Sequence, residues 1–302
     1  MSIDVVYAFV DCGNAAWKEK YIMNHEKYFD EKINNIDASL MRRFESNDEL
    51  KYSLRSLAKY TNWVNRIFVV VDNKDQIPKW LNDDKIIIIE HQQIIPNEFL
   101  PTFNSQVIEL YLHKIPDISE PFVYFNDDMM IGKPLLLTDL VENSKIKIYL
   151  SDSYSKTGNP TPSEIGYRSA WKNGNAYLDK KFKKEKRYKT HHVPVVIYKS
   201  IMEEIWNDLY QKLIQTSGMK FRSYTDYNIV CSVYPYYCYY NNRGLLMNEQ
   251  CVNIFETDET LLDQKFELIL SETVPFFCIN EYFKKNDDML NTMFPNKSHF
   301  EN

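Results

Sequence analysis

The sequence predicts an α/β fold with a Rossmann-like, mostly parallel sheet flanked by helices and completed by a helical C-terminal part. Short runs of Val, Ile and aromatic residues alternate with helical patterns over residues 1–140. Buried strands of a parallel sheet have this continuous apolar character. A chain of 302 residues is also long enough to bury a substantial core.

The strands and helices of this first part follow one another in a regular order. Strands are predicted over 5–10, 67–71, 86–89 and 122–125, each bounded by Asp or Asn. A capping box over 46–49 predicts the start of a helix that buries Leu50, Leu54 and Leu57. Another helix is expected over 104–114. Strand–helix alternation implies right-handed crossovers between parallel strands.

The remainder of the chain is less regular. Residues 151–175 collect Ser, Thr, Gly, Asn and Pro, which predicts an excursion out of the core. Residues 180–189 hold seven Lys or Arg against one Glu, a local charge of +6. Helices are expected over 201–213 and from near Thr225. We therefore predict a single domain, with an α/β core over 1–140, an excursion with a basic strip over 141–190, and a part over 191–302 that completes the site.

Composition excludes several functional classes. The chain has seven glycines, about 2% of its residues against the roughly 7% that is usual. Their spacing forms no dinucleotide fingerprint, P-loop or nucleophile elbow. A net charge of −6 argues against nucleic acid as a partner. Five cysteines without any C-x-x-C favour reduced thiols. No signal peptide or apolar run of about 20 residues is found, so a cytoplasmic location is expected.

Asn126, Asp127 and Asp128 directly follow the predicted strand over 122–125. Ligands of open α/β sheets bind beyond the carboxyl ends of the strands. Adjacent carboxylates at that edge suit Mg²⁺ or Mn²⁺, which binds protein carboxylates together with phosphate oxygens. The simpler alternative is that Asn126 and Asp127 cap the next turn.

Asp11 and Glu109 are further acidic candidates. Asp11 closes the first strand and is suited to accept hydrogen bonds from a ribose or base, or else it only starts a turn. Glu109 lies between apolar Ile108 and Leu112 on a predicted helix, so it either points toward the sheet edge or is a solvated surface residue.

Histidine and arginine candidates follow later in the chain. His191 and His192 are both candidates for a general base near neutral pH, although single histidines are commonly structural. Arg222 and Asp226 form either a surface i,i+4 pair or a phosphate-binding fork oriented by the carboxylate. The basic strip 180–189 is a solvated, mobile face or attracts an anionic partner. Five tyrosines over 234–240 are interpreted as core packing rather than a sugar-stacking platform.

These residues resemble the Stealth family, which includes bacterial capsular polysaccharide phosphotransferases and the lysosomal-enzyme N-acetylglucosamine-1-phosphotransferase. The resemblance covers nearly the whole chain in four regions. They comprise residues 4–11, 43–132 with Asn104 and the Asn126-Asp127-Asp128 run, 192–226 with His192, Arg222 and Asp226, and 277–280 ending in Asn280. The first region departs from the family pattern because Asn14 replaces its second acid.

The resemblance implies the transfer of a sugar 1-phosphate from a UDP-sugar donor to a hydroxyl of a glycan or lipid-linked oligosaccharide, with release of UMP. Residues 1–140 would then bind the nucleotide sugar, with Mg²⁺ or Mn²⁺ at Asp127 and Asp128. The implied catalytic residues are Glu109, Asp128, His192 and Arg222. The implied substrate-binding residues are Asp11, Asn104, Asn126, Asp226 and Asn280.

Two alternatives remain open from the residues alone. Strand-end acids equally suit a metal-dependent glycosyltransferase that releases UDP, and only the resemblance separates it from phosphoryl transfer. An inactive glycan-binding or assembly protein is the third reading. The resemblance also implies a role in capsule or cell-surface polysaccharide synthesis, with peripheral contact between the basic strip and an anionic membrane.

Overall fold

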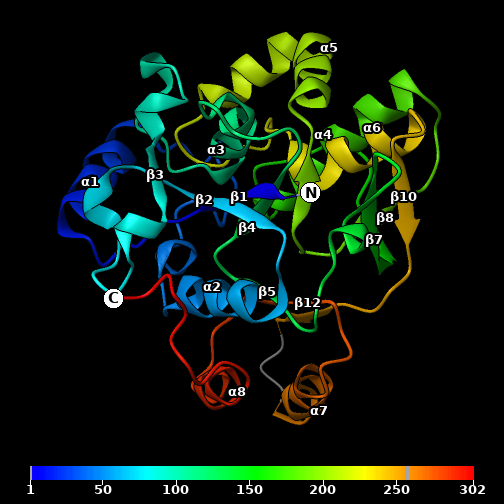
Figure 1. Ribbon diagram of the computed structural model, residues 1–302. Helices are drawn as coiled ribbons and strands as arrows, with labels where there is room; N and C mark the ends of the chain where they lie inside the picture. Colours follow the sequence, from blue (N-terminus) through cyan, green and yellow to red (C-terminus); the bar gives the residue numbers. More distant parts are fainter. Residues whose placement is uncertain (1, 256–258) are drawn as a thin grey trace.

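The computed structural model of the chain describes residues 2–255 and 259–302. Its centre is a five-stranded sheet in the order β3-β2-β1-β4-β9 (Figure 1). The first four strands are parallel, and β9 pairs antiparallel with β4. The strands are β1 (Ile3–Ala8), β2 (Val64–Val71), β3 (Ile87–Glu90), β4 (Phe122–Asn126) and β9 (Val195–Ile197).

Helices cover both faces of this sheet. Figure 1 shows α2 (Glu49–Tyr60) on one side and α3 (Ser105–Tyr111) and α5 (Lys199–Ser217) on the other. The regular spacing of apolar residues makes α2 amphipathic, and Leu50, Leu54 and Leu57 are buried as expected. The first helix, α1 (Ala15–Tyr28), follows β1 and packs its Trp17 against a separate aromatic cluster.

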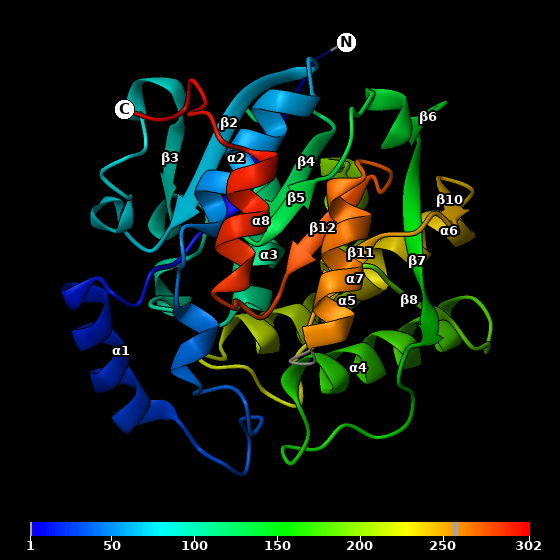
Figure 2. The ribbon, with the colours of Figure 1, turned by 90° about the horizontal axis from the view of Figure 1, so that it is seen from below.

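A small second sheet joins the C-terminal part to the strand-end residues. β5 (Met129–Ile131) begins directly after Asp128 and pairs antiparallel with β12 (Phe276–Ile279), which pairs in parallel with β11 (Val252–Ile254). Helices α7 (Glu259–Leu270) and α8 (Lys285–Met293) lie on the outer side of this sheet (Figure 2). The strand β12 therefore returns to the point where β4 ends.

A third sheet forms the remaining flank of the molecule. It contains β6 (Val141–Glu142), β7 (Lys145–Tyr154), β8 (Tyr188–Thr190) and β10 (Gly244–Met247). Next to it lie α4 (Gly166–Lys181), a π-helical turn over Ile229–Val233 and α6 (Tyr234–Tyr240). Tyr234, Tyr236 and Tyr237 are buried, which confirms core packing for these three tyrosines, whereas Tyr239 is exposed.

The α/β prediction is confirmed, and all four predicted strands occur within about three residues of their expected bounds. The helix expected over 104–114 is α3 followed by a 3₁₀ turn at Leu112–Lys114. The helix expected over 201–213 is α5. None of the described helices has a stretch that is both long and apolar enough to cross a lipid bilayer.

The segment over 151–175 begins in β7 and ends in α4. Two local predictions are wrong. The capping box over 46–49 does not form: Asp48 precedes the helix in a left-handed conformation, and Glu49 turns back to accept from the Asn47 N–H. The helix expected near Thr225 begins only at Ile229, because hydrogen bonds to side chains hold the preceding residues in a turn.

The basic strip is not uniformly solvated either. Arg187 is 3% exposed, and its guanidinium donates to Asp179 Oδ1 at 2.7 Å. Lys181 pairs with Asp208 on α5. Lys180, Lys184 and Lys186 remain exposed, so the charge available to an external partner is smaller than the sequence suggests.

Candidate active site

Polar side chains gather along the carboxyl edge of the central sheet. His91 follows β3, Asp72 follows β2, Asp11 lies beyond β1, and Asn126 ends β4. Because β9 runs antiparallel to β4, the segment before it, with His192, lies at the same edge. The strand order thus arranges these residues in a row across the edge where ligands of open α/β sheets bind.

The densest group in this row surrounds Asn126. Its amide Nδ2 lies 2.9 Å from His192 Nε2, and its amide oxygen accepts from the Tyr124 hydroxyl. Asp128 Oδ1 lies 3.4 Å from the same His192 nitrogen. The two side chains are only partly buried, with 25% of His192 and 20% of Asp128 exposed. Three of the predicted site residues thus meet where solvent and substrate have access.

The strand β12 brings the C-terminal part to Asp128. The Ile279 N–H donates to the Asp128 carbonyl at 3.0 Å, which fixes the two segments side by side. Asn280 Nδ2 lies 3.5 Å from Asp128 Oδ2, and the Cys278 thiol donates to Asn280 Oδ1 at 3.2 Å. Asn280 therefore joins the cluster as the sequence predicted.

Two ionisable groups at this turn have pKa values far from their ordinary values. Burial raises the pKa of Asp127 well above its ordinary value, and the nearby Asp128 and Glu49 raise it further. Burial also opposes protonation of His192, but the adjacent Asp128 outweighs it and raises the His192 pKa well above its usual range. Such perturbed groups beside an accessible edge are typical of functional sites.

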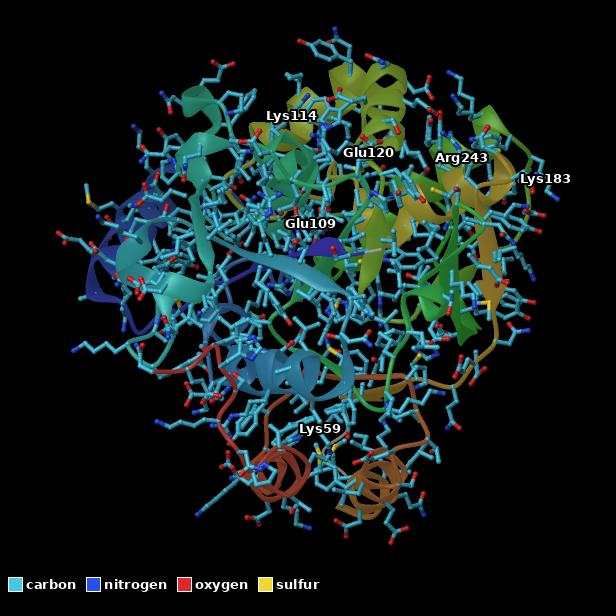
Figure 3. The ribbon with its side chains drawn as sticks, viewed as in Figure 1. Lys59, Glu109, Lys114, Glu120, Lys183 and Arg243 are labelled. Atoms are coloured by element: carbon cyan, nitrogen blue, oxygen red, sulfur yellow. The ribbon has the colours of Figure 1, made fainter. Side chains whose placement is uncertain are left out.

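Glu109 reaches the same region from α3. It is 5% exposed and lies near the centre of the molecule, in contrast to Lys114 and Lys183 (Figure 3). The Tyr124 hydroxyl lies 3.5 Å from Glu109 Oε1, while Oε2 has no hydrogen-bond partner. Burial raises the pKa of Glu109 to about 7, against the opposing effects of Arg222 and His192. Glu109 thus points toward the sheet edge and not into solvent.

Arg222 lies next to the first turn of α3. Its Nη2 donates to Ser105 Oγ at 2.7 Å. Gly166, at the start of α4, packs directly against it, because a Cβ built on Gly166 would lie 3.2 Å from Arg222 Cδ. A side chain at residue 166 would therefore displace the arginine. The absence of a side chain there lets α4 support Arg222.

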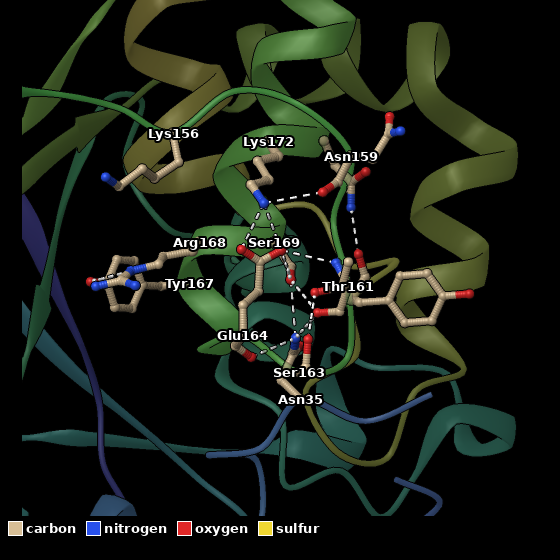
Figure 4. A network of polar contacts seen from close by, with 12 residues as sticks. Asn35, Lys156, Asn159, Thr161, Ser163, Glu164, Tyr167, Arg168, Ser169 and Lys172 are labelled. Carbon is tan, nitrogen blue, oxygen red and sulfur yellow. Dashed lines mark hydrogen bonds and ion pairs between the residues drawn. The ribbon is translucent and has the colours of Figure 1, made fainter. Parts of the chain in front are cut away.

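Polar contacts anchor the chain that leads into α4. Glu164 pairs with Lys172 at 2.7 Å and accepts from Ser169, while Asn35 donates to Ser169 Oγ (Figure 4). The Asn35 amide also donates to the Thr161 carbonyl. This network ties residues 161–172 to the loop after α1, on the side of the molecule where Gly166 contacts Arg222.

Asn104 and Asp226 form a separate, fully buried pair. Asn104 Nδ2 donates to Asp226 Oδ2 at 2.7 Å, and the Ser223 N–H donates to the same oxygen at 2.8 Å. The predicted i,i+4 helical pair of Arg222 and Asp226 is wrong, because these residues lie in a turn before the helix. Burial raises the pKa of Asp226 to about 7. Its contacts hold the turn that carries Arg222.

Asp11 occupies the sheet edge beyond β1. Its Oδ1 accepts from the Gly13 N–H at 2.7 Å, so the carboxylate caps its own turn. Its carbonyl accepts from Gln76 Nε2 at 3.3 Å, which links the segments after β1 and β2. Both contacts are structural, and ligand binding by Asp11 stays a prediction.

A divalent cation fits part of the strand-end cluster. Asp128, His192 and Cys278 offer ligand atoms that all lie within 4.8 Å of one another. Asp128 Oδ1 is buried without a hydrogen-bond partner, which leaves an acceptor for a cation. Mg²⁺ and Mn²⁺ prefer carboxylate and amide oxygens, so Asp128 fits them while the imidazole and thiol fit softer metals.

Tyr124 and Cys278 belong to this region although the sequence analysis did not select them. Strand side chains alternate between faces, so Tyr124 shares a side of β4 with Asn126, and Cys278 shares a side with Asn280. Each lies two residues before a predicted site residue, Asn126 or Asn280, and this spacing is the signal in the sequence that could have identified both.

Two conserved-region models match the chain. "Stealth protein CR2, conserved region 2" matches residues 43–149, and "Stealth protein CR3, conserved region 3" matches residues 191–239. Together they cover more than half of the sequence and include Glu109, Asp128, His192 and Arg222. The chain belongs to the Stealth family.

Curated relatives of this Stealth protein are bacterial phosphotransferases. The chain is 33% identical to the capsular polysaccharide phosphotransferase fcs1 of Haemophilus influenzae, over 97% of this chain and 81% of that protein. It is 34% identical to the capsular polysaccharide phosphotransferase cps1A of Actinobacillus pleuropneumoniae, over 83% of this chain and 69% of that protein. The exopolysaccharide phosphotransferase SCO6023 of Streptomyces coelicolor is 32% identical over 95% of this chain but only 48% of its own length.

Solved structures of glycosyltransferases are more distantly similar. The galactosyltransferase LgtC, in complex with donor and acceptor sugar analogs, aligns over 98% of both chains with a TM-score of 0.46 and 9% identity. Mouse xyloside xylosyltransferase 1 aligns over 93% of this chain and 98% of its own, with a TM-score of 0.44 and 8% identity.

Proposed function

We propose that this Stealth protein is a phosphotransferase that moves a sugar 1-phosphate from a UDP-sugar to a glycan hydroxyl and releases UMP. One observation carries the proposal: Glu109, Asn126, Asp128, His192 and Arg222, all inside the matched regions, lie at one edge of the sheet. The relatives named as capsular and exopolysaccharide phosphotransferases support the same reaction class.

The reaction needs charge stabilisation and a proton acceptor. Attack of an acceptor hydroxyl on the sugar-proximal phosphorus forms a new P–O bond and breaks the bridge to UMP, which leaves with the electron pair. Negative charge develops on the phosphoryl oxygens and on UMP, so catalysis depends mainly on positioning and electrostatics. Arg222 is the cation placed to bind phosphate, because its guanidinium presents several N–H donors.

The hydroxyl proton goes to the His192–Asp128 pair. At 3.4 Å the two groups form an ion pair when His192 is protonated, and Asn126 orients the imidazole. The raised pKa of His192 favours that protonated form, in which Asp128 is the direct acceptor, whereas a neutral His192 would accept the proton itself. Glu109, nearly buried beside Tyr124, orients the acceptor or a bound water.

Asp128 and the adjacent Asp127 would hold Mg²⁺ or Mn²⁺. When bound, the cation supplies positive charge that balances the donor phosphates. Asn280, which contacts Asp128, adds an amide to the same turn. Burial and the nearby Asp128 raise the pKa values of Asp127 and Glu49, and a bound cation would favour the ionised forms of both carboxyls.

A product assay tests this function. The purified protein is incubated with candidate UDP-sugars, Mg²⁺ or Mn²⁺ and an acceptor glycan or lipid-linked oligosaccharide, and the released nucleotide is identified. UMP supports sugar-phosphate transfer. UDP would instead establish a glycosyltransferase, and neither nucleotide with any donor would favour an inactive glycan-binding or assembly protein.

The exposed lysines of the basic strip are proposed to contact an anionic membrane peripherally, at the inner face of the plasma membrane. Each lysine near such a surface contributes about 1 kcal/mol. Lys180→Glu with Lys184→Glu should weaken sedimentation with phosphatidylglycerol vesicles. The exposed Lys32 and Lys212, changed together to Glu, are the control, and equal loss in both variants would show only a net-charge effect.

A further inference from the structure

A cavity of about 80 Å³ lies at the other half of the sheet edge, next to the carboxyl ends of β1 and β2. Its apolar walls come from Phe9, Trp17, Phe44 and Phe103, which belong to three separate stretches of the chain. Three of these rings pack together, with Trp17 5.1 Å from Phe44 and 5.4 Å from Phe103 between ring centroids. The walls are therefore rigid and suited to a flat ring.

His91 is the polar group of this cavity that lacks a partner. The side chain is 5% exposed, and neither ring nitrogen has a hydrogen-bond partner. Asp72 Oδ1 is 4.0 Å from His91 Nδ1, which is beyond hydrogen-bond reach. A buried polar group left unpaired costs about 1–3 kcal/mol, so its retention in a cavity wall points to a ligand.

The protonation state of His91 suits a neutral ligand edge. Burial lowers its pKa below the ordinary value, against the opposing effect of Asp72. At neutral pH the imidazole is therefore uncharged and offers one N–H donor and one acceptor nitrogen. Either function can form a hydrogen bond with a carbonyl or an N–H group on the edge of a nucleobase.

Two arginines connect the cavity to the Asp128 cluster. Arg43 and Arg222 both line it, and burial together with the nearby Arg222 lowers the pKa of Arg43 to about 9. Arg43 pairs with Asp37 at 2.7 Å, whereas Arg222 contacts Ser105 and also acts electrostatically on Glu109. Positive charge thus lies between the apolar cavity and the cluster, where the phosphates of a nucleotide would lie.

We propose that this cavity binds the base of the nucleotide donor, with His91 hydrogen-bonding the edge of the base and the aromatic walls enclosing its ring. The inference rests on the proposed function, which supplies a uridine nucleotide as donor. It assigns nucleoside recognition to residues after β2 and β3. The bound nucleotide then runs along the sheet edge from His91, past the arginines, to Asp128.

The test compares a ligand that has a base with one that lacks it. Calorimetry measures binding of UMP and of ribose 5-phosphate to the wild type, His91→Leu and His91→Gln. We expect His91→Leu to weaken UMP about 10- to 100-fold, as expected for one or two lost hydrogen bonds, and to leave ribose 5-phosphate unchanged. His91→Gln, which keeps a donor and an acceptor, should recover most of the UMP affinity.

His113 provides a matched control. It is 2% exposed, its ring nitrogens also lack hydrogen-bond partners, and it is not among the residues that line the cavity. His113→Leu should therefore leave UMP affinity unchanged. Should His91→Leu not fold, Ile108→Trp fills the same cavity and should lower UMP affinity at least tenfold.

The outcomes separate this site from the proposed function. Unchanged UMP affinity in His91→Leu overturns the base site, even if turnover releases UMP. Where His91→Leu does not fold, unchanged UMP affinity in Ile108→Trp overturns it in the same way. Equal losses for UMP and ribose 5-phosphate also overturn it, because the histidine would then not read the base. A UMP-specific loss supports the base site even if no sugar phosphate is transferred, in which case only the function fails.

Discussion

Two Asp–Asn pairs in this molecule have the same chemistry and opposite surroundings. Asp128 lies beside Asn126 and His192 at the sheet edge, is 20% exposed and keeps an unpartnered oxygen. Asp226 is fully buried, and its Oδ2 accepts from Asn104 and from the Ser223 N–H. Asp226 Oδ1 also lacks a hydrogen-bond partner, so an unused acceptor does not distinguish the two aspartates. Accessibility, more than residue type, is what separates Asp128, which we propose for chemistry, from Asp226, which holds a turn.

The substitution Asp128→Asn should have the largest effect on activity. Loss of the carboxylate would remove both the proposed proton acceptor and the proposed oxygen ligand of the cation, so kcat should fall about 10³-fold or more. The melting temperature should change little, because the side chain is partly exposed. Asp208→Asn, which removes an ion pair with Lys181 on a distant surface, should keep at least half of the wild-type kcat. Comparable turnover in the two variants would contradict the role of Asp128.

Asp226→Ala should instead act on stability. Two buried donors, from Asn104 and Ser223, lose their acceptor, which costs about 2–4 kcal/mol of unfolding free energy. Denaturant unfolding measures this loss, and Asp226→Asn should recover part of it by keeping an oxygen. A variant that unfolds like the wild type yet loses turnover would show that Asp226 takes part in chemistry after all.

The substitution Glu109→Gln tests how the free energy of unfolding depends on pH. The unfolded carboxyl ionises near pH 4.5, whereas the folded one keeps its proton until about pH 7. The folded state therefore binds more protons between these values, and the free energy of unfolding falls as pH rises through this window. Asp226 adds to the fall in the same direction.

Glutamine cannot ionise, so Glu109→Gln should remove about 2–3 kcal/mol of the decline between pH 5 and pH 8. Denaturant unfolding of the wild type and the variant at both pH values checks this expectation. Parallel pH dependence in the two proteins would show that Glu109 titrates normally.

Ser105→Ala is the smallest of these tests. It removes the hydroxyl that accepts from Arg222 Nη2 at 2.7 Å, so the guanidinium loses one anchor, while Cβ and Cδ of Arg222 keep their packing against Gly166. A loss of about 1 kcal/mol, or roughly fivefold in kcat/KM, is expected without a change in melting temperature. The exposed Ser163→Ala is the control. A full loss of activity would mean that Ser105 itself contacts the substrate.

Much of the α/β core could be predicted because its signals are local. Apolar runs over 67–71 and 122–125 form buried strands whatever their partners are, and the period of α2 follows from its own residues. The turn at Arg222–Asp226 could not be predicted in the same way. Its conformation depends on Asn104, which is 122 residues away in sequence and satisfies the Asp226 carboxylate that a helix would expose.

The residues of the site likewise divide into those that the sequence predicts and those that only the structure reveals. Asn126 and Asp128 are visible in the sequence because they end an apolar strand. His91 also follows a strand, yet its significance comes from what it lacks, namely any hydrogen-bond partner in a buried position. Only the surroundings of a side chain reveal a missing contact, so pattern and spacing cannot predict it.

The pairing of β12 with β5 has a consequence for biosynthesis. Asn280 and Cys278 reach Asp128 only through this late strand, so a ribosome must translate more than nine-tenths of the chain before the reaction centre can be assembled. Nascent chains and C-terminal truncation fragments that end before β12 are therefore expected to lack turnover, even where their parallel core has already formed.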